Sequence, residues 1–106
     1  MHLVGGYAEQ RVDRPYHHAY DPATNRWEEL AQLPRGANHV GVATHGERLY
    51  AFGGFLEQNR TPHDGAYAFD GQRWHTLRRR PEACGAMACI ALGDVIHIIG
   101  GAIGSD

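Results

Sequence analysis

Eight histidines are the residues of this sequence that most directly suggest metal chemistry. His17 and His18 are adjacent, so on a strand they would point to opposite faces and could not chelate one ion. The other histidines fall in separate segments, without a His-x-His or His-x3-His pair. We therefore expect surface or strand-filling histidines, no bound metal and no other cofactor.

The thiols, hydroxyls and carboxylates do not form a recognisable catalytic set. Cys84 and Cys89 are five residues apart, which on a strand places them on opposite faces and about 16 Å apart, too far for a disulfide. We expect both to be small buried thiols. The only serine is Ser105, so no Ser-His-Asp set can be assembled in this segment. Four carboxylates are more typical of solvated loop charges than of an acid–base pair: Glu9, Asp13, Glu57 and Asp64.

The composition excludes several classes of protein and favours β-structure. Hydrophobic residues make up 42% and charged residues 21% of the chain, as in soluble globular proteins. The formal net charge of −2 lacks the basic excess that binds nucleic acids or anionic membranes. The sequence has no apolar run of about 20 residues and no signal peptide at its start, so we expect a cytoplasmic protein. Fourteen glycines and five prolines predict many turns and an all-β fold.

An internal repeat runs along the whole chain. Three short apolar segments each end in a double glycine, and the first glycines of these pairs, Gly5, Gly53 and Gly100, are 48 and 47 residues apart. Two tryptophans and two prolines keep the spacing of 47 residues. The residues of the repeated motif are Gly5, Gly6, Tyr20, Asp21, Trp27, Gly53, Gly54, Asp70, Trp74, Gly100 and Gly101, with Pro34 and Pro81 closing the units.

This motif resembles the kelch repeat, in which an apolar strand ends in Gly-Gly, a Tyr-Asp or similar pair closes the third strand and a Trp opens the fourth. The resemblance implies four-stranded antiparallel blades of a β-propeller of bacterial type, related in fold to the propellers of galactose oxidase and sialic acid mutarotase. Galactose oxidase is a copper enzyme. This chain has no identifiable set of paired His and Tyr ligands with a Cys at matched positions.

The repeat divides the chain into three parts. We expect a partial blade in residues 1–34 (strands b to d), a complete blade in 35–81, and a partial blade in 82–106 (strands a and b). Small and apolar residues predict innermost strands, buried on both faces, at 38–44 and 85–92. Short outer strands should begin at Trp27 and Trp74, whose rings pack one blade on the next.

Two periods are too few to close a propeller, which needs four to eight blades. The faces at either end of a two-period stack would be left open. We therefore expect that the chain associates with itself or with the remaining blades of a longer parent chain.

The loops after the first two double glycines, residues 7–16 and 55–65, are longer than a hairpin needs. Loops on a rigid scaffold are where binding residues gather, and arginines with aromatic residues suit recognition of polar groups. In kelch propellers generally, these loops form the ligand face together with the start of the innermost strand, here Asn38-His39 and Gly85-Ala86. The candidate binding residues are Asn38, His39, Arg11, Arg14, Phe55, Glu57, Arg60 and His63.

We therefore expect a non-catalytic binding scaffold whose loop face recognises a protein segment or a small polar or carbohydrate ligand. The alternative is a sugar-processing enzyme resembling the kelch-type sialic acid mutarotases. The lack of a catalytic set favours binding. Neither a nucleic acid nor a membrane is expected as a partner.

Overall fold

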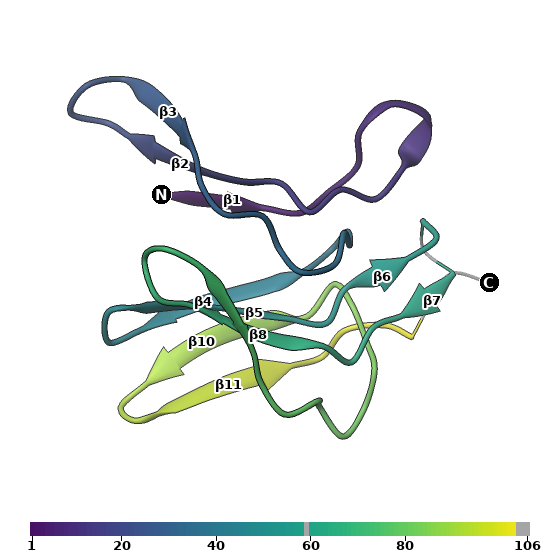
Figure 1. The fold of residues 1–106 in the computed structure, drawn as a ribbon. Coiled ribbons are helices and arrows are strands. Elements are labelled where there is room, and N and C mark those ends of the chain that lie inside the picture. The colour runs from purple at the N-terminus through teal and green to yellow at the C-terminus, as the bar shows by residue number, and fades with distance from the viewer. Residues whose placement is uncertain (59, 104–106) are drawn as a thin grey trace.

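The fold consists of antiparallel β-sheets that follow one another along the chain (Figure 1). The structure, a computed structural model, describes residues 1–58 and 60–103, without the side chain of Arg11. It confirms the expected all-β class, including a four-stranded sheet. Within the described residues, no helix is long and apolar enough to span a bilayer.

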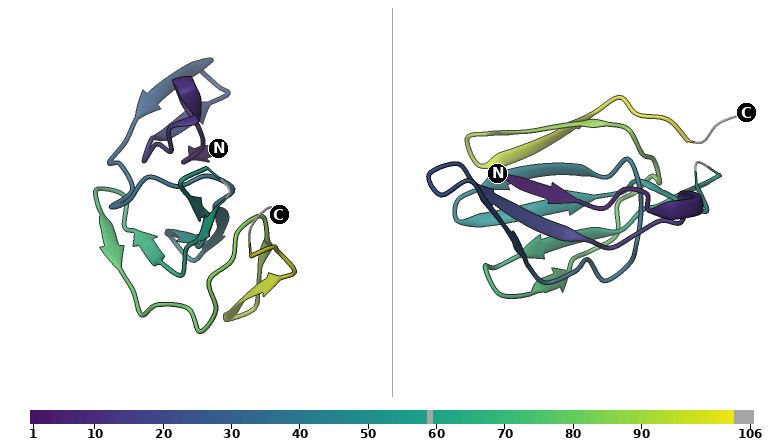
Figure 2. Two further views of the ribbon diagram at one scale, coloured as in Figure 1. Left: turned by 90° about the vertical axis from the view of Figure 1, so that its right-hand side faces the viewer. Right: turned by 90° about the horizontal axis from the view of Figure 1, so that it is seen from above.

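Three sheets make up the body of the molecule, and the second lies between the other two (Figure 2). The first sheet has the order β1 (His2–Val4), β2 (His17–Asp21), β3 (Arg26–Glu29). The second has the order β4 (Gly41–His45), β5 (Arg48–Phe52), β8 (Ala66–Phe69), β9 (Trp74–Thr76). The third pairs β10 (Ala88–Leu92) with β11 (Val95–Ile99). The smaller elements are the 3-10 turn η1 (Glu9–Arg11) and the hairpin of β6 (Phe55–Leu56) with β7 (Thr61–Pro62). The blade boundaries expected at residues 34 and 81 stay a prediction.

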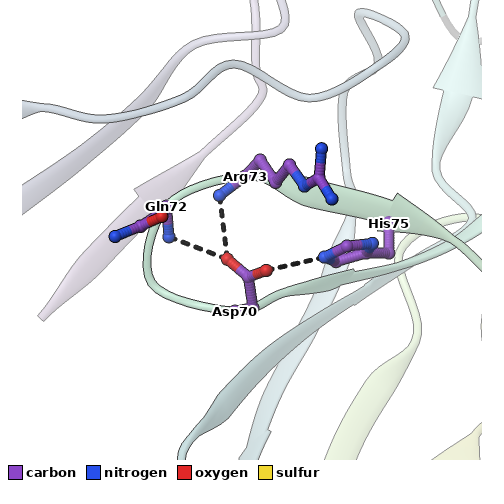
Figure 3. A network of polar contacts seen from close by, with 4 residues as sticks. All are labelled: Asp70, Gln72, Arg73 and His75. Atoms are coloured by element: carbon purple, nitrogen blue, oxygen red, sulfur yellow. Dashed lines mark hydrogen bonds and ion pairs between the residues drawn. The ribbon is translucent and has the colours of Figure 1, made fainter.

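Tight turns join the paired strands where the sequence predicts them. Gly46 and Gly93 have φ angles of +63° and +58° in the β4–β5 and β10–β11 hairpins. The β8–β9 turn is organised by Asp70 (Figure 3). Its Oδ1 accepts hydrogen bonds of 2.9 Å from the backbone N–H groups of Gln72 and Arg73, and its Oδ2 lies 2.6 Å from Nε2 of His75.

The two innermost strands begin later than expected and are covered differently. β4 begins at Gly41 and β10 at Ala88. The preceding residues turn the chain through the left-handed region, with φ of +52° at His39 and +57° at Ala86, so the extended ladder cannot include them. The expected burial on both faces is also wrong, because alternate residues of both strands are open, such as Val42 at 37% exposure.

The first two double glycines each link one sheet to the segment that leads into the next. The N–H of Gly54 donates to the carbonyl oxygen of Cys84 at 3.0 Å, and that of Gly6 to Ala37 at 2.8 Å. A Cβ at Gly53 would collide with the Cys84 carbonyl oxygen, and one at Gly54 would lie 2.6 Å from that of Asn38. Positive φ angles of +59° and +100° add to the requirement for glycine at Gly53 and Gly54.

The core lies between the first and second sheets. Its buried residues Leu33, Ala51 and Tyr67 pack with the partly buried Val4, Val40 and Trp74. The indole N–H of Trp74 donates to the carbonyl oxygen of Ala31 at 2.8 Å. This confirms for Trp74 the expected packing of one repeat on another.

A buried histidine completes this interface. His17 is 1% exposed, and its ring lies edge-on to Phe69, with the ring centroids 4.7 Å apart. Because a carbonyl oxygen only accepts, Nδ1 of His17 donates to Ala31 at 3.1 Å. In the neutral ring, Nε2 then accepts from Nδ1 of His2 at 2.8 Å. The expectation of a strand-filling histidine is met here.

The outer faces of the first and third sheets carry exposed apolar side chains. Trp27 is 54% exposed, because no described sheet lies against its side of β3, and its packing against another blade stays a prediction. On the third sheet Ile90, Leu92, Val95 and Ile99 are each at least 50% exposed. That self-association or further blades cover these faces stays a prediction. Both cysteines are free thiols, with Cys84 buried and Cys89 half-buried.

Candidate ligand-binding cleft

Two loops from neighbouring sheets lie together at one end of the molecule, which we call the loop end (Figure 1). The first, residues 7–16, contains η1 and is closed by a bridge between Tyr7 and Asp13. The second, residues 55–65, contains the β6–β7 hairpin, whose turn is formed by residues with positive φ, Glu57 at +51° and Gln58 at +64°. Both loops therefore contain antiparallel backbone pairing among the residues that the structure describes.

Asn38 ties the two loops together. Its side chain is 1% exposed, and Nδ2 lies 2.6 Å from Oδ1 of Asp13 in the first loop. The same amide nitrogen lies 3.1 Å from the carbonyl oxygen of Phe55 and 2.7 Å from that of Gln58, both in the second loop. Oδ1 of Asn38 accepts a hydrogen bond from Nδ1 of His39 at 2.6 Å. This side chain thus fixes the distance between the loops.

A cleft of about 420 Å³ lies between the loops. The first loop contributes polar and apolar groups to one wall, and the second loop contributes the other wall. Arg35 and Gly36, in the segment that leads to β4, complete the lining. The full set is Gln10, Val12, Asp13, Arg35, Gly36, Leu56, Glu57, Gln58 and Arg60. The cleft combines charged groups of both signs with apolar side chains.

The predicted binding residues occupy different positions around this cleft. Glu57 and Arg60 are exposed and line it. Phe55 is 4% exposed and does not line the cleft. The exposed His39 ring packs against the rings of Phe55 and Tyr7, with centroids 5.8 Å and 6.2 Å apart.

Of the remaining predicted residues, Arg14 and Asn38 lie outside the lining of the cleft. Arg14 is half-buried, and its buried Nε has no hydrogen-bond partner among the described residues. Arg11 belongs to η1, but its side chain lies outside the described part of the structure. Asn59 of the second loop and Ser105 also lie outside the described residues. Asn38 is occupied with holding the loops. The binding roles of all these residues stay predictions.

His63 lines a second hollow, of about 390 Å³, on the other side of Arg35. The other lining residues are Pro34, Arg35, Asp64, Tyr67, Thr76 and Arg79. Nε2 of His63 and the hydroxyl of Tyr67 are hydrogen bonded at 3.0 Å. Sequence reasoning missed Arg35 and Arg79. The run of three arginines, Arg78 to Arg80, was the available signal for Arg79.

Burial and neighbouring charges act together on the titratable groups of the second hollow. Burial lowers the pKa of His63, Asp64 acts against this, and Arg35 and Arg79 lower the pKa further. Burial also raises the pKa of the Tyr67 hydroxyl, while Arg35 and Arg79 favour its ionised form. At neutral pH the His63 ring is therefore uncharged, and the hydroxyl of Tyr67 keeps its proton.

The third sheet has no polar side chain at the position that corresponds to Asn38. Gly85 stands where the second sheet has Asn38, and its backbone pairs with Ala102 as Asn38 pairs with Phe55. A Cβ at Gly85 would lie 2.8 Å from the ring of Phe55, so that ring occupies the space of a side chain. Across the described residues, no group of three or more His, Cys, Asp or Glu side chains is placed to hold a metal ion.

Comparison with known proteins agrees with this geometry. Residues 37–79 match the family described as Kelch motif. Kelch-like protein 25 of Xenopus tropicalis is 30% identical over 110 residues, which cover 95% of this chain and 19% of that protein. Kelch-like protein 38 of Homo sapiens is 31% identical over 99 residues, 92% of this chain and 17% of that protein. Kelch-like protein 9 of Mus musculus is 29% identical over 75 residues, 69% of this chain and 12% of that protein.

The chain thus spans less than a fifth of the length of these relatives. All three are vertebrate proteins, so the matches support the kelch repeat itself and not the bacterial type that we expected. The double glycines, the repeated tryptophan, the four-stranded antiparallel sheet and the match over residues 37–79 agree with one another. We conclude that the chain is a kelch-motif protein built of kelch repeats.

Proposed function

We propose that the protein is a binding scaffold whose loop-end cleft recognises a polar segment of a partner protein or a small polar ligand. The observation that carries the proposal is the cleft of about 420 Å³ between loops of two successive repeats. This volume falls within the range of about 300–1,000 Å³ that is usual for ligand pockets.

The lining supports recognition of a polar ligand. Arg35 and Arg60 can donate hydrogen bonds to carboxylates or carbonyl oxygens, and Asp13 and Glu57 can accept from amides or cations. Val12 and Leu56 add apolar surface between these groups. A few placed polar groups beside an apolar surface give a pocket orientation and specificity.

The contacts of Asn38 support binding by an ordered site. Because its amide holds Asp13 of one loop and the backbone of the other, the walls of the cleft are fixed before a ligand arrives. A ligand then loses less free energy to ordering of the protein.

Selection from a displayed peptide library against the immobilised chain tests this proposal, with a panel of neutral and acidic monosaccharides titrated in parallel. Selected ligands should shift the backbone amide NMR signals of Gln10, Gln58 and Arg60. The variants Arg60→Gln and Glu57→Gln should weaken binding at least about tenfold, since each removes a charge-assisted contact.

Arg73→Gln is the matched control, because Arg73 lies in the β8–β9 turn and contributes to neither wall of the cleft. Its affinity for selected ligands should equal that of the unchanged chain. Ligands that bind all the variants equally, or whose NMR shifts gather away from both loops, would refute the cleft as the recognition site.

A further inference from the structure

The second hollow at the loop end brings together hydrogen-bond donors from separate segments. Arg35 comes from the connection that leads to β4, Arg79 follows β9, and Thr76 ends β9. His63 and Tyr67 come from the second loop and from β8. None of His63, Tyr67 or Arg79 lines the first cleft, so this hollow is a separate candidate site.

The two arginines have no partner for their charges in the part of the chain that the structure describes. Neither guanidinium group forms an ion pair or donates a hydrogen bond to these residues. Asp64 also lines the hollow, and it is not ion paired with either arginine. With His63 neutral, two positive charges and one negative charge leave the hollow with a net positive charge.

His63 and Tyr67, which line the hollow, are closely packed. A Cβ at Gly65 would collide with the His63 ring and lie 2.7 Å from the Tyr67 hydroxyl, so the hydrogen-bonded pair rests directly on this glycine. Tyr67 is 9% exposed, with its ring in the core between the first two sheets. The polar atoms of this pair are therefore held in place by packing.

We propose that this hollow binds the phosphoryl group of a phosphorylated protein segment, held by Arg35 and Arg79 above the His63–Tyr67 pair. Two guanidinium groups present planar sets of donors that match phosphate oxygens. A phosphate monoester has three free oxygens and a charge of about −1.5 to −2, whereas a carboxylate has two oxygens and one charge. The donor number and the net positive charge beside Asp64 both fit the phosphate group better.

Titration of the full chain with four small probes, monitored by backbone amide NMR, tests the proposal. The probes are inorganic phosphate, capped phosphoserine, capped serine and succinate. Capped phosphoserine should shift the signals of Asp64, Tyr67 and Arg79 and bind more tightly than inorganic phosphate. Succinate should bind at least about tenfold more weakly, because it presents single charges to the two arginines.

Four variants assign the binding to this hollow. Arg79→Gln and Arg35→Gln should each weaken binding of capped phosphoserine at least about tenfold, with unchanged unfolding midpoints, since both side chains are exposed. Arg73→Gln, which removes the same charge from the β8–β9 turn, should leave binding unchanged. Arg60→Gln should also leave it unchanged, which separates this site from the first cleft.

Each of the following results would refute one part of the proposal. No shift with either phosphate probe, or an equal loss in Arg73→Gln, refutes a phosphate site in this hollow. Equal binding of succinate refutes the phosphate class. Inorganic phosphate that binds while capped phosphoserine does not would assign the hollow to free phosphate and refute the protein segment.

Discussion

Trp27 and Trp74 occupy the same position of two successive repeats and lie in different surroundings. Trp74 is partly buried, with its ring centroid 5.3 Å from that of His17 in the first sheet, and it donates to the Ala31 carbonyl oxygen. Trp27 is 54% exposed, and its ring contacts Tyr20 of its own sheet. The tryptophan of a repeat is therefore buried by the repeat that precedes it.

This difference shows where the stability of a repeat lies. The backbone ladder of each sheet is formed within the sheet, but the apolar faces are covered only by the neighbouring sheet. The same packing brings the loops of the first two sheets together across the cleft. Folding and the candidate site thus depend on one interface.

The largest expected difference is between the two tryptophan variants. Trp74→Ala should lower the free energy of unfolding by about 3 kcal/mol, because it opens a cavity between the first two sheets. Trp27→Ala should change it by less than about 1 kcal/mol, since its ring is mostly in solvent. Chemical denaturation followed by circular dichroism measures both. Equal losses would contradict burial by the preceding repeat.

Asn38 and Gly85 provide a second comparison between repeats. Asn38→Ala should lower the free energy of unfolding by about 2 kcal/mol, because it removes hydrogen bonds from one buried and one partly buried carbonyl oxygen. Hydrogen exchange should then quicken in residues 55–65 and remain slow around Gly85, whose backbone bridge needs no side chain. Unchanged exchange in the second loop would show that Asn38 does not hold it.

The interface between the first two sheets should also weaken in acid. Burial lowers the pKa of His17, His2 and His18 lower it further, and the Ala31 carbonyl acts in the opposite direction. A lowered pKa means that the folded state favours the neutral ring, so this stability is present above the ordinary histidine pKa and is lost as the pH falls below it.

The denaturant concentration at the unfolding midpoint should therefore decrease as the pH is lowered from about 7.5 to about 5.5. His17→Gln should reduce this decrease, and the remainder comes from His2 and His63, whose pKa values burial also lowers. His97→Gln is the matched control, because His97 lies exposed on β11 in the third sheet. A dependence that persists in His17→Gln and disappears in His97→Gln would place the titrating group elsewhere.

The smallest expected effect is a difference in acid sensitivity between the β8–β9 turn and the β2–β3 turn. The pKa of Asp70 is held well below its usual range by hydrogen bonds from His75 and from the backbone of Arg73 and Gln72. This contribution is present above the ordinary aspartate pKa and is lost as the pH falls below it. Asp70→Asn should reduce the loss of stability in acid measured by denaturation from pH 5 to about pH 3.

Asp21 in the first sheet is the comparison for this turn. Its carboxylate accepts one hydrogen bond from the backbone N–H of Ala23, without a histidine partner. Asp21→Asn should therefore change the acid dependence less than Asp70→Asn. The opposite order would contradict the role assigned to His75.

The repeat predicts much of the fold, because its landmarks have local physical causes. The double glycines and the hairpin glycines Gly46 and Gly93 adopt the positive φ angles that their turns require. The starts of β4 and β10 were not predicted, because the left-handed conformation of Ala86 has no signal in its residue type and that of His39 has only a weak one. Burial on both faces was wrong because it depends on neighbouring sheets, which no single strand sequence reveals.

The candidate site was predicted in outline. The loops and the residues Glu57 and Arg60 could be found from length and charge, and both line the cleft. The role of Asn38 in joining the loops could not be predicted, because Asp13 and Gln58 are far from it in sequence. Arg35 and Arg79 were missed for the same reason, since only the folded connections bring them to His63.

Acrylamide quenching of two single-tryptophan variants tests the central claim most directly, at a concentration where sedimentation shows a monomer. Trp27→Phe leaves Trp74 as the reporter, and Trp74→Phe leaves Trp27. Packing of the first sheet on the second predicts blue-shifted emission and weak quenching for Trp74, and clearly stronger quenching for the half-exposed Trp27. Equal quenching of the two tryptophans would contradict the interface and the cleft that it forms.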